Sequence, residues 1–110
     1  MELDEQDAGT HVTLVARRRL NLVAAPLVRS RIDDLVRDGR VRIIVDLQGV
    51  ASVDSSGLGA LIGGLKSARQ AGGDVRIAAP GEQVRAVLGL TNLDKVLTPY
   101  ESVEAAGRDW

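Results

Sequence analysis

Short apolar runs separated by turn residues predict four strands along this chain. The run at 41–47 is the strongest, because its alternate residues are apolar on one face and Ile44 adds an apolar side chain to the other. A strand that is apolar on both faces is typical of a parallel sheet covered by helices. The predicted strands are residues 11–16, 41–47, 75–78 and 95–98, and residues 1–10 form either an edge strand or a frayed tail.

Apolar residues spaced three and four positions apart predict helices between these strands. One helix is opened by residues 21–26, with Asn21 as a candidate cap, and is closed by residues 37–39. The central helix spans roughly residues 56–70, and its apolar stripe begins at Leu58, which we therefore expect in the core. The remaining helices are residues 82–88 and a short segment from residue 102.

Strands and helices alternate along the chain, which predicts one α/β domain over residues 1–110. We expect a mostly parallel central sheet of about 4–5 strands with about four helices, joined by right-handed crossovers. In such sheets the loops at the carboxyl ends of the strands form the functional edge. The loops at 17–21 and 48–55 both leave carboxyl ends, so we expect them to be neighbours. Gly63 and Gly64 indicate that one face of the central helix packs closely on the sheet.

The composition narrows the classes of function. Aromatic residues make up 2% of the chain and the net charge is −1, so neither base stacking nor attraction to nucleic acid or anionic lipid is expected. The sequence has no cysteine, which excludes thiol catalysis and thiolate metal sites. No apolar run approaches the ~20 residues of a membrane helix, and the first residues lack a secretory pattern. We expect a soluble, cytoplasmic domain that binds neither membrane nor nucleic acid directly.

Familiar enzyme motifs are incomplete in this sequence. Gly57–Leu58–Gly59 begins a dinucleotide-binding fingerprint, but Ile62 stands at the third glycine position. The single histidine, His11, lies far upstream of the serines, so no Ser–His–Asp set is expected. We therefore expect no enzyme, no catalytic residues, no cofactor and no metal site.

Residues 53–59 join the strongest predicted strand to the central helix and place an aspartate and two serines at its start. In one interpretation a serine hydroxyl caps the helix by accepting from free backbone N–H groups, which is worth about 1 kcal/mol. In the other a serine is phosphorylated, because free N–H groups and the positive end of the helix dipole favour an anion. The two interpretations are compatible, since one residue can serve as a cap and as a switch.

The segment 54–59, Asp–Ser–Ser–Gly–Leu–Gly after a valine- and isoleucine-rich strand, resembles the phosphoacceptor loop of anti-sigma factor antagonists, the STAS domains. The resemblance covers roughly residues 14–106. Further segments match the family's landmarks in the same order, namely residues 20–27, where the first helix starts, 71–75 and 90–93. This agreement in order makes the resemblance far more specific than a single tetrapeptide would.

The resemblance implies a protein whose binding is controlled by phosphorylation. The unmodified domain binds an anti-sigma factor that is also an ATP-dependent serine kinase, and this binding frees a sigma factor. The kinase phosphorylates the serine directly after the aspartate, here Ser55, and releases the antagonist. A metal-dependent serine phosphatase reverses the step. ATP and metal belong to the partners, so this chain needs no cofactor of its own.

We assign roles within the loop on this basis. Asp54 positions the loop, Ser55 is the phosphoacceptor, and Ser56 caps the helix and is a secondary candidate for phosphorylation. Gly57 and Gly59 permit the close approach of a partner backbone. The predicted partner-binding residues are Asp54, Ser55, Ser56, Gly57, Leu58, Gly59, Arg18, Arg19 and Asn21.

One departure from the family pattern precedes the first helix. The family usually has Gly–Glu–Leu–Asp there, and residues 18–21 of this chain are Arg–Arg–Leu–Asn. Arg18 and Arg19 either belong to a solvated loop, or one of them lies near Ser55 and pairs with its phosphate, or the partner's surface is more acidic than usual.

Two other functions stay open from the sequence alone. A STAS-like domain that is never phosphorylated would act as a scaffold or as a subunit of a transport complex. A nucleotide-binding domain would use the same edge of the sheet, although a glycine loop that cradles phosphate is absent. We expect a monomer or a weak dimer.

Overall fold

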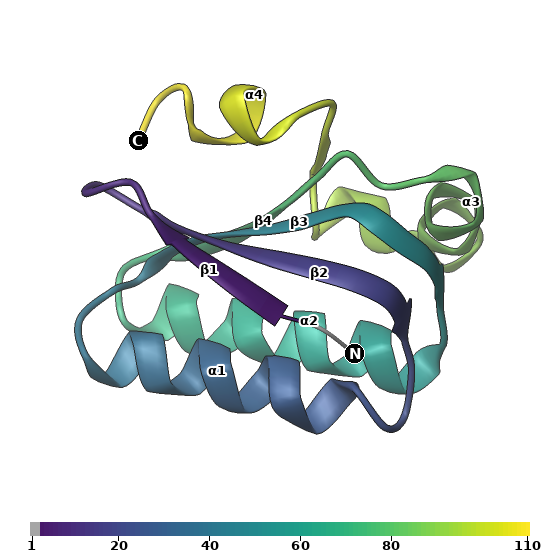
Figure 1. The fold of residues 1–110 in the computed structure, drawn as a ribbon, viewed down its shortest axis with the longest axis horizontal. Helices are drawn as coiled ribbons and strands as arrows, with labels where there is room; N and C mark the ends of the chain where they lie inside the picture. Colours follow the sequence, from purple (N-terminus) through teal and green to yellow (C-terminus); the bar gives the residue numbers. More distant parts are fainter. Residues whose placement is uncertain (1–2) are drawn as a thin grey trace.

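Within residues 3–110, five strands form one central sheet: Leu3–Asp7 (β1), Val12–Leu20 (β2), Arg42–Val53 (β3), Asp74–Ala78 (β4) and Pro99–Tyr100 (β5). They are hydrogen-bonded in chain order from β1 to β5 (Figure 1). β1 is antiparallel to β2, and the other three pairings are parallel. The computed structural model describes residues 3–110, so Met1 and Glu2, within the predicted edge strand or tail, lie outside the described residues.

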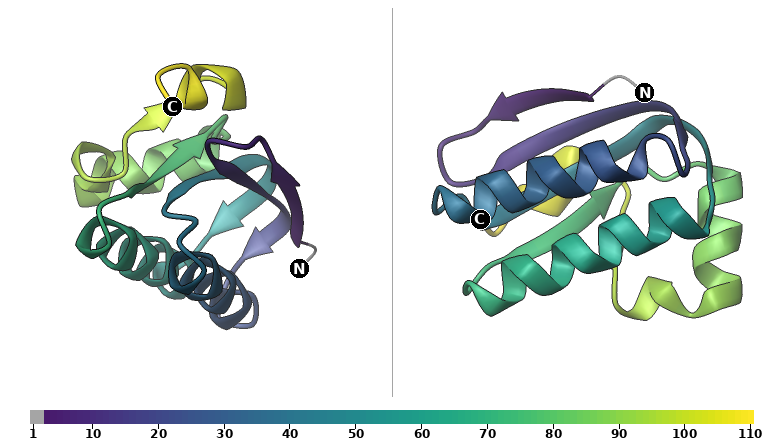
Figure 2. Two further views of the ribbon diagram at one scale, coloured as in Figure 1. Left: turned by 90° about the vertical axis from the view of Figure 1, so that its left-hand side faces the viewer. Right: turned by 90° about the horizontal axis from the view of Figure 1, so that it is seen from below.

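Helices cover both faces of this sheet. They are Ala25–Arg37 (α1), Ser55–Gln70 (α2), Glu82–Thr91 (α3) and Val103–Gly107 (α4), and a 3₁₀ turn at Leu93–Lys95 follows α3. α1 and α2 lie side by side under one face, and α4 lies over the opposite face, as the two views of Figure 2 show. α3 lies at the end of the sheet where β3 turns into α2 (Figure 1). The predicted α/β class with a mostly parallel sheet is confirmed.

The core between the sheet and the helices α1 and α2 is aliphatic. Leu14 of β2 and Ile32 of α1 are fully buried in it. Leu58 is 7% exposed and packs in the same cluster, as the apolar stripe of α2 predicted. Ile44 lies in a second buried cluster with Ala106 of α4, so β3 is buried on both faces as its sequence predicted.

β2 and β3 are longer than the sequence predicted. The hydrophobic pattern ended them at residues 16 and 47, because arginines follow in one strand and polar or small residues in the other. That prediction was wrong, since the pairing continues to Leu20 opposite Val53. Two register shifts of the pairing, between Asp46 and Gly49 and between Val50 and Ser52, each place one extra residue in β3. They mark β-bulges in that strand, which increase the twist of a strand and bend it. The bent end of β3 leads down to α2 (Figure 1).

The last strand was also predicted in the wrong place. Residues 95–98 were expected to be extended, but a 3₁₀ turn covers Leu93–Lys95 and the strand is Pro99–Tyr100. Leu97 is fully buried in the core. The apolar pattern at 95–98 therefore indicates a buried side chain and not a paired strand. Periodicity cannot distinguish these two cases in so short a run.

Gly63 and Gly64 pack against α1 and not against the sheet, which corrects the prediction. A Cβ added to Gly64 would lie 2.7 Å from Cδ1 of Ile32, and a Cβ on Gly63 would overlap the guanidinium of Arg29. Arg29 crosses between the helices and donates to the hydroxyl of Ser67 in α2 at 3.3 Å. These glycines therefore allow α1 and α2 to approach closely where Arg29 and Ile32 face α2.

Arg76 of β4 holds the C-terminal segment on the second face of the sheet. Its side chain is 13% exposed, and its guanidinium carbon lies 3.9 Å from the centre of the Trp110 ring. The guanidinium donates to the carbonyl oxygen of Ala106 and to a carboxylate oxygen of Asp109, each at 2.6 Å. Because Trp110 is the single tryptophan of the chain, its fluorescence reports on this contact.

Protonation of Asp109 is expected to loosen this segment. The hydrogen bond from Arg76 holds the pKa of the Asp109 carboxyl below its usual value. Such a carboxyl stabilises the fold above its unfolded-state pKa of about 3.9, and the contribution is lost as the pH falls through the lower, folded-state pKa. Trp110 emission should therefore change on acidification below about pH 4. At pH 7, Asp109→Asn should already show the Trp110 emission that the wild type shows only after acidification. The control Asp7→Asn, in β1, should have the Trp110 emission of the wild type.

Candidate functional site

The carboxyl end of β3 and the start of α2 form the region in which the sequence predicts the site. Asp54 separates the two elements, and Ser55 is the first residue of α2. The end of β2 lies beside them, because Leu20 pairs with Val53 and its carbonyl oxygen accepts the N–H of Asp54 at 3.2 Å. The segments at the carboxyl ends of β2 and β3 are therefore neighbours, as expected from the topology.

Asp54 is the N-cap of α2 and also joins that helix to the loop before α1. Its backbone is extended, with φ −110° and ψ −176°, and its Oδ1 accepts the N–H of Gly57 at 2.9 Å. Its Oδ2 accepts the N–H of Leu22 at 3.1 Å. The prediction that Ser56 caps the helix was wrong, because the residue with the extended backbone that a cap needs is Asp54.

Ser55 presents its hydroxyl at the surface of the first turn. The residue is exposed, and within residues 3–110 its hydroxyl has no hydrogen-bond partner. Asp54 accepts the N–H groups of Gly57 and Leu58, with its side chain and its carbonyl oxygen respectively. The N–H groups of Ser55 and Ser56 have no acceptor within the same described part of the chain. A negatively charged group on Ser55 would therefore meet backbone donors and the positive end of the helix dipole.

The loop before α1 exposes two large apolar side chains beside this turn. Oδ1 of Asn21 accepts the N–H groups of Val23 at 3.1 Å and Ala24 at 3.2 Å, so Asn21 closes a turn before the helix. The prediction that Asn21 caps this helix was wrong, because the N-cap position is Ala24. In this loop Leu22 is 70% exposed and Val23 is 82% exposed. Neither exposed side chain was predicted from the sequence, although an apolar pair between a turn-forming asparagine and Pro26, outside the helical stripe, was an available signal.

A shallow groove runs between the starts of α1 and α2, next to Ser55. Its volume is about 270 Å³. Gly59 is exposed, and a Cβ added there would meet no atom within 4 Å, so this part of the groove is open. The groove places an apolar wall directly beside the turn that carries the two serines. It is lined by Leu22, Ala25, Pro26, Arg29, Ser56, Gly59 and Ala60.

Gly57 and Leu58 face into the protein, unlike Gly59. Gly57 is buried, and a Cβ added to it would lie 2.2 Å from the carbonyl oxygen of Leu20. The backbone that Gly57 admits is therefore that of β2 in the same chain and not that of a partner, which corrects the role predicted for it. Leu58 is buried in the core, so neither residue adds to the exposed surface of the site.

Comparison with known proteins decides the family. The family model described as STAS domain matches residues 3–106. This chain belongs to the STAS domain family. A protein of Thermotoga maritima that is named as a candidate anti-sigma factor antagonist is 34% identical over 96 residues, which are 86% of this chain and 85% of that protein.

Solved structures share the fold of this STAS domain. The match to a crystal structure of a candidate anti-sigma factor antagonist from Thermotoga maritima covers 97% of this chain and 92% of the Thermotoga chain, with a TM-score of 0.91 and 30% identity. The match to the Bacillus cell fate determinant SpoIIAA, solved in its phosphorylated form, covers 97% of this chain and 98% of the SpoIIAA chain, with a TM-score of 0.76 and 20% identity. At that identity the likeness to SpoIIAA shows the fold alone.

Arg18 and Arg19 lie near the end of β2 in this STAS domain, opposite the bulged end of β3. Both are exposed. Arg18 has a φ of 73°, in the left-handed region that side chains other than glycine rarely adopt, and it lies at a register shift of the ladder. The strand that carries them ends beside Asp54. That either arginine pairs with a phosphate on Ser55 stays a prediction.

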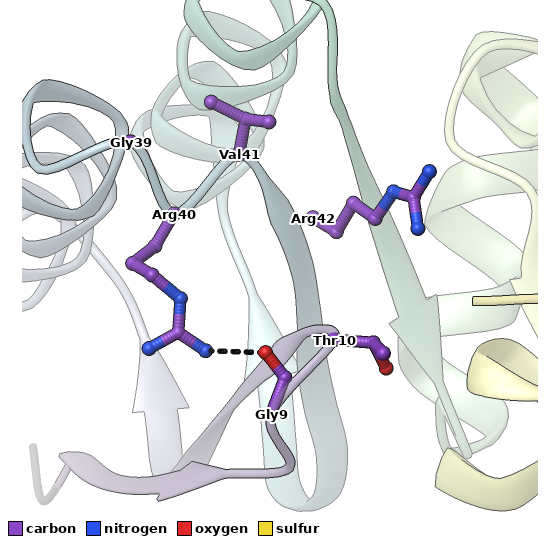
Figure 3. Close-up of a pocket in the computed structure, with 6 residues that line it drawn as sticks. All are labelled: Gly9, Thr10, Gly39, Arg40, Val41 and Arg42. Carbon is purple, nitrogen blue, oxygen red and sulfur yellow. Dashed lines mark hydrogen bonds between the residues drawn. The ribbon is translucent and has the colours of Figure 1, made fainter.

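A polar pocket of about 250 Å³ lies at the other end of the STAS domain's sheet (Figure 3). Arg40, which lines this pocket, donates from its guanidinium to the carbonyl oxygen of Gly9 at 3.4 Å and pairs with Asp7 at 2.6 Å. The pocket lies at the amino ends of β2 and β3, whereas Ser55 follows the carboxyl end of β3. It is lined by Gly9, Thr10, Gly39, Arg40, Val41 and Arg42 and is separate from the candidate site.

Two further findings concern the whole described chain. Within residues 3–110, no three histidine, aspartate or glutamate side chains gather closely enough to hold a metal ion. Among the helices of the same residues, none has the length and apolar character that crossing a bilayer requires.

Proposed function

We propose that this STAS domain is an anti-sigma factor antagonist whose binding is controlled by phosphorylation of Ser55. The unmodified form binds an anti-sigma factor, which frees a sigma factor and so regulates transcription. The observation that carries the proposal is the exposed Ser55 hydroxyl at the start of α2, beside the exposed side chains of Leu22 and Val23. The names of the Thermotoga maritima relatives support this class of partner.

A phosphate on Ser55 would change binding without unfolding the domain. The N–H groups of Ser55 and Ser56 and the positive end of the α2 dipole stabilise the added charge of about −1.5 to −2. An anti-sigma factor docked over this turn has to desolvate that charge, which costs several kcal/mol when no partner group compensates it. The solved phosphorylated form of SpoIIAA supports the view that this fold tolerates the modification.

The proposal assigns the chemistry to the partners. An anti-sigma factor serine kinase transfers a phosphoryl group from ATP to the oxygen of Ser55, and a metal-dependent serine phosphatase removes it by hydrolysis. The STAS domain acts as a binding module and as a substrate in the cytoplasm, without a cofactor of its own. Arg18 or Arg19 contacts the phosphate or an acidic surface of the kinase, as the charge of this segment predicts.

Incubation with the kinase and ATP, followed by intact-mass measurement, tests the switch. The mass should rise by one phosphoryl group, and Ser55→Ala should abolish the increase. Fragmentation of the phosphoprotein separates Ser55 from the secondary candidate Ser56. A domain that gains no phosphate would instead be a scaffold or a transport-complex subunit, and heat released on titration with ATP or GTP would indicate a nucleotide-binding domain.

Leu22→Asp is expected to weaken binding of the anti-sigma factor about 10-fold or more. Full burial of a leucine side chain at an interface is worth about 1.5–3 kcal/mol, and 1.4 kcal/mol corresponds to a factor of ten in affinity. Leu90→Asp is the matched control, because Leu90 is 85% exposed on α3 and does not line the groove. Isothermal titration calorimetry measures both affinities. Equal binding by the two variants and the wild type would contradict a role of this loop in docking.

A further inference from the structure

The end of β3 extends past its neighbour β4. The pairing of β3 with β4 stops at Ala78 opposite Asp46, whereas β2 accompanies β3 as far as Val53. Residues 47–53 of β3 therefore have a strand on one side only. The backbone N–H and C=O groups that point to the other side need different partners, because unpaired backbone groups are costly when they are shielded from water.

Gln83, in the first turn of α3, supplies such a partner at the last residue of β3. Its Oε1 accepts the N–H of Val53 at 3.0 Å, and its Nε2 donates to the carbonyl oxygen of Val53 at 3.4 Å. The side-chain amide thus pairs with Val53 much as a peptide group of a neighbouring strand would. Val53 directly precedes Asp54, so this pairing acts on the peptide that leads into the cap of α2 and to Ser55.

The helix that carries Gln83 is itself anchored. Val84 and Leu88 of α3 are each 1% exposed and belong to the main core cluster. The guanidinium of Arg85 donates to the carbonyl oxygen of Pro80 at 3.0 Å, which ties the first turn of α3 to the segment before it. The backbone of Gln83 is therefore held by the core, and its side chain, although the residue is exposed, reaches Val53 from this anchored helix.

We propose that Gln83 is a positioning residue for the phosphoacceptor turn. It holds the end of β3 on the side away from β2, so that Asp54 keeps its contacts with Gly57 and Leu22 and the orientation of Ser55 is fixed. The part of this inference that concerns phosphate transfer rests on the proposed function. The positioning of the turn is a property of the chain alone and can be measured without a partner.

Amide hydrogen exchange of the purified domain tests the positioning. Gln83→Met keeps the length of the side chain and removes its amide, so the Val53 amide should exchange about 10-fold faster or more, and the Asp54 and Gly57 amides about 3- to 10-fold faster. Gln70→Ala is the matched control, because Gln70 is exposed at the end of α2 and its side chain has no hydrogen bond within residues 3–110. Unchanged exchange at Val53 in Gln83→Met would overturn the proposal.

Gln83→Glu distinguishes the hydrogen bond from mere filling of space. At pH 7 its carboxylate still accepts the N–H of Val53 but cannot donate to the carbonyl oxygen. The Val53 amide should therefore stay better protected than in Gln83→Met, while the turn is less well held than in the wild type. Equal loss of protection in both variants would show that the amide pairing does not hold this residue.

Phosphorylation kinetics give a second readout, on the acceptor itself. Gln83→Met should lower the maximal rate of phosphate transfer to Ser55 about 3- to 10-fold, because a less fixed hydroxyl reaches the reactive geometry less often. The KM of the kinase for the domain should change less than about twofold, since the docking surface at Leu22 is untouched. Faster exchange with an unchanged transfer rate would overturn the effect on the acceptor. Absence of phosphorylation in the wild type would refute the proposed function and not the exchange result.

Discussion

Phosphorylated Ser55 and the Ser55→Asp variant are expected to bind the anti-sigma factor weakly, and Ser55→Ala is expected to bind it as the wild type does. The Ser55 hydroxyl makes no hydrogen bond within the described residues 3–110, so alanine removes no contact of the free domain. A negative charge at this position has to lose its water when the partner docks. We expect a loss of affinity of about 100-fold or more for the phosphoprotein and about 10-fold or more for the aspartate variant, which carries less charge.

Calorimetric titration of these proteins separates a local switch from a general effect of charge. Ser30→Asp is the matched control, because Ser30 is exposed on α1, does not line the groove, and the substitution adds the same charge as Ser55→Asp. This control should bind with wild-type affinity. The melting temperature of Ser55→Asp should not fall, since a carboxylate at the start of α2 is favourable to the helix dipole. Equal binding of the wild type, Ser55→Ala and Ser55→Asp would contradict the switch.

The sequence predicts those parts of the site that depend on local pattern. An apolar run, a short polar segment and a helical stripe follow one another at residues 41–65, and this order alone places Asp54 and Ser55 at the start of a helix. The predicted cap, Ser56, lies two residues after the observed cap, Asp54. Sequence pattern does not show which residue adopts the extended backbone that a cap needs. The predicted end of β3 at residue 47 was also wrong. Bulges let a strand continue through residues whose apolar and polar positions no longer alternate.

The features that the sequence did not predict depend on contacts between distant segments. The exposure of Leu22 follows from a turn that Asp54 holds from 32 residues away, and Gln83 reaches Val53 across 30 residues. Neither pair shares an element or a periodicity, so no pattern within a window of the chain links them. Both contacts converge on the same turn. The turn that carries Ser55 is therefore specified jointly by β2, the loop before α1 and α3, none of which the segment 53–59 contains.

Gly57→Ala is expected to destabilise the domain by about 3 kcal/mol, at the upper end of the usual range for overpacking. The added Cβ would lie 2.2 Å from the carbonyl oxygen of Leu20 and 2.8 Å from its Cγ. A backbone carbonyl cannot swing aside as the end of a long side chain can. The same carbonyl accepts the N–H of Asp54, so relief of the clash has to separate β2 from the start of α2. For a domain of about this size, the melting temperature should fall by about 10–20 °C.

Gly59→Ala is the matched control, two residues further along the same helix. An added Cβ meets no atom within 4 Å, and alanine is a better helix former than glycine by up to about 1 kcal/mol, so this variant should melt at a higher temperature. Because Gly59 lines the groove, its new methyl group should also weaken binding of the anti-sigma factor, whereas Gly57→Ala should lose stability and binding together. Thermal unfolding followed by circular dichroism, with calorimetric titration of each variant, measures both effects. Wild-type melting of Gly57→Ala would mean that the Leu20 carbonyl is not held against α2, and the joint that presents Ser55 would then have to lie elsewhere.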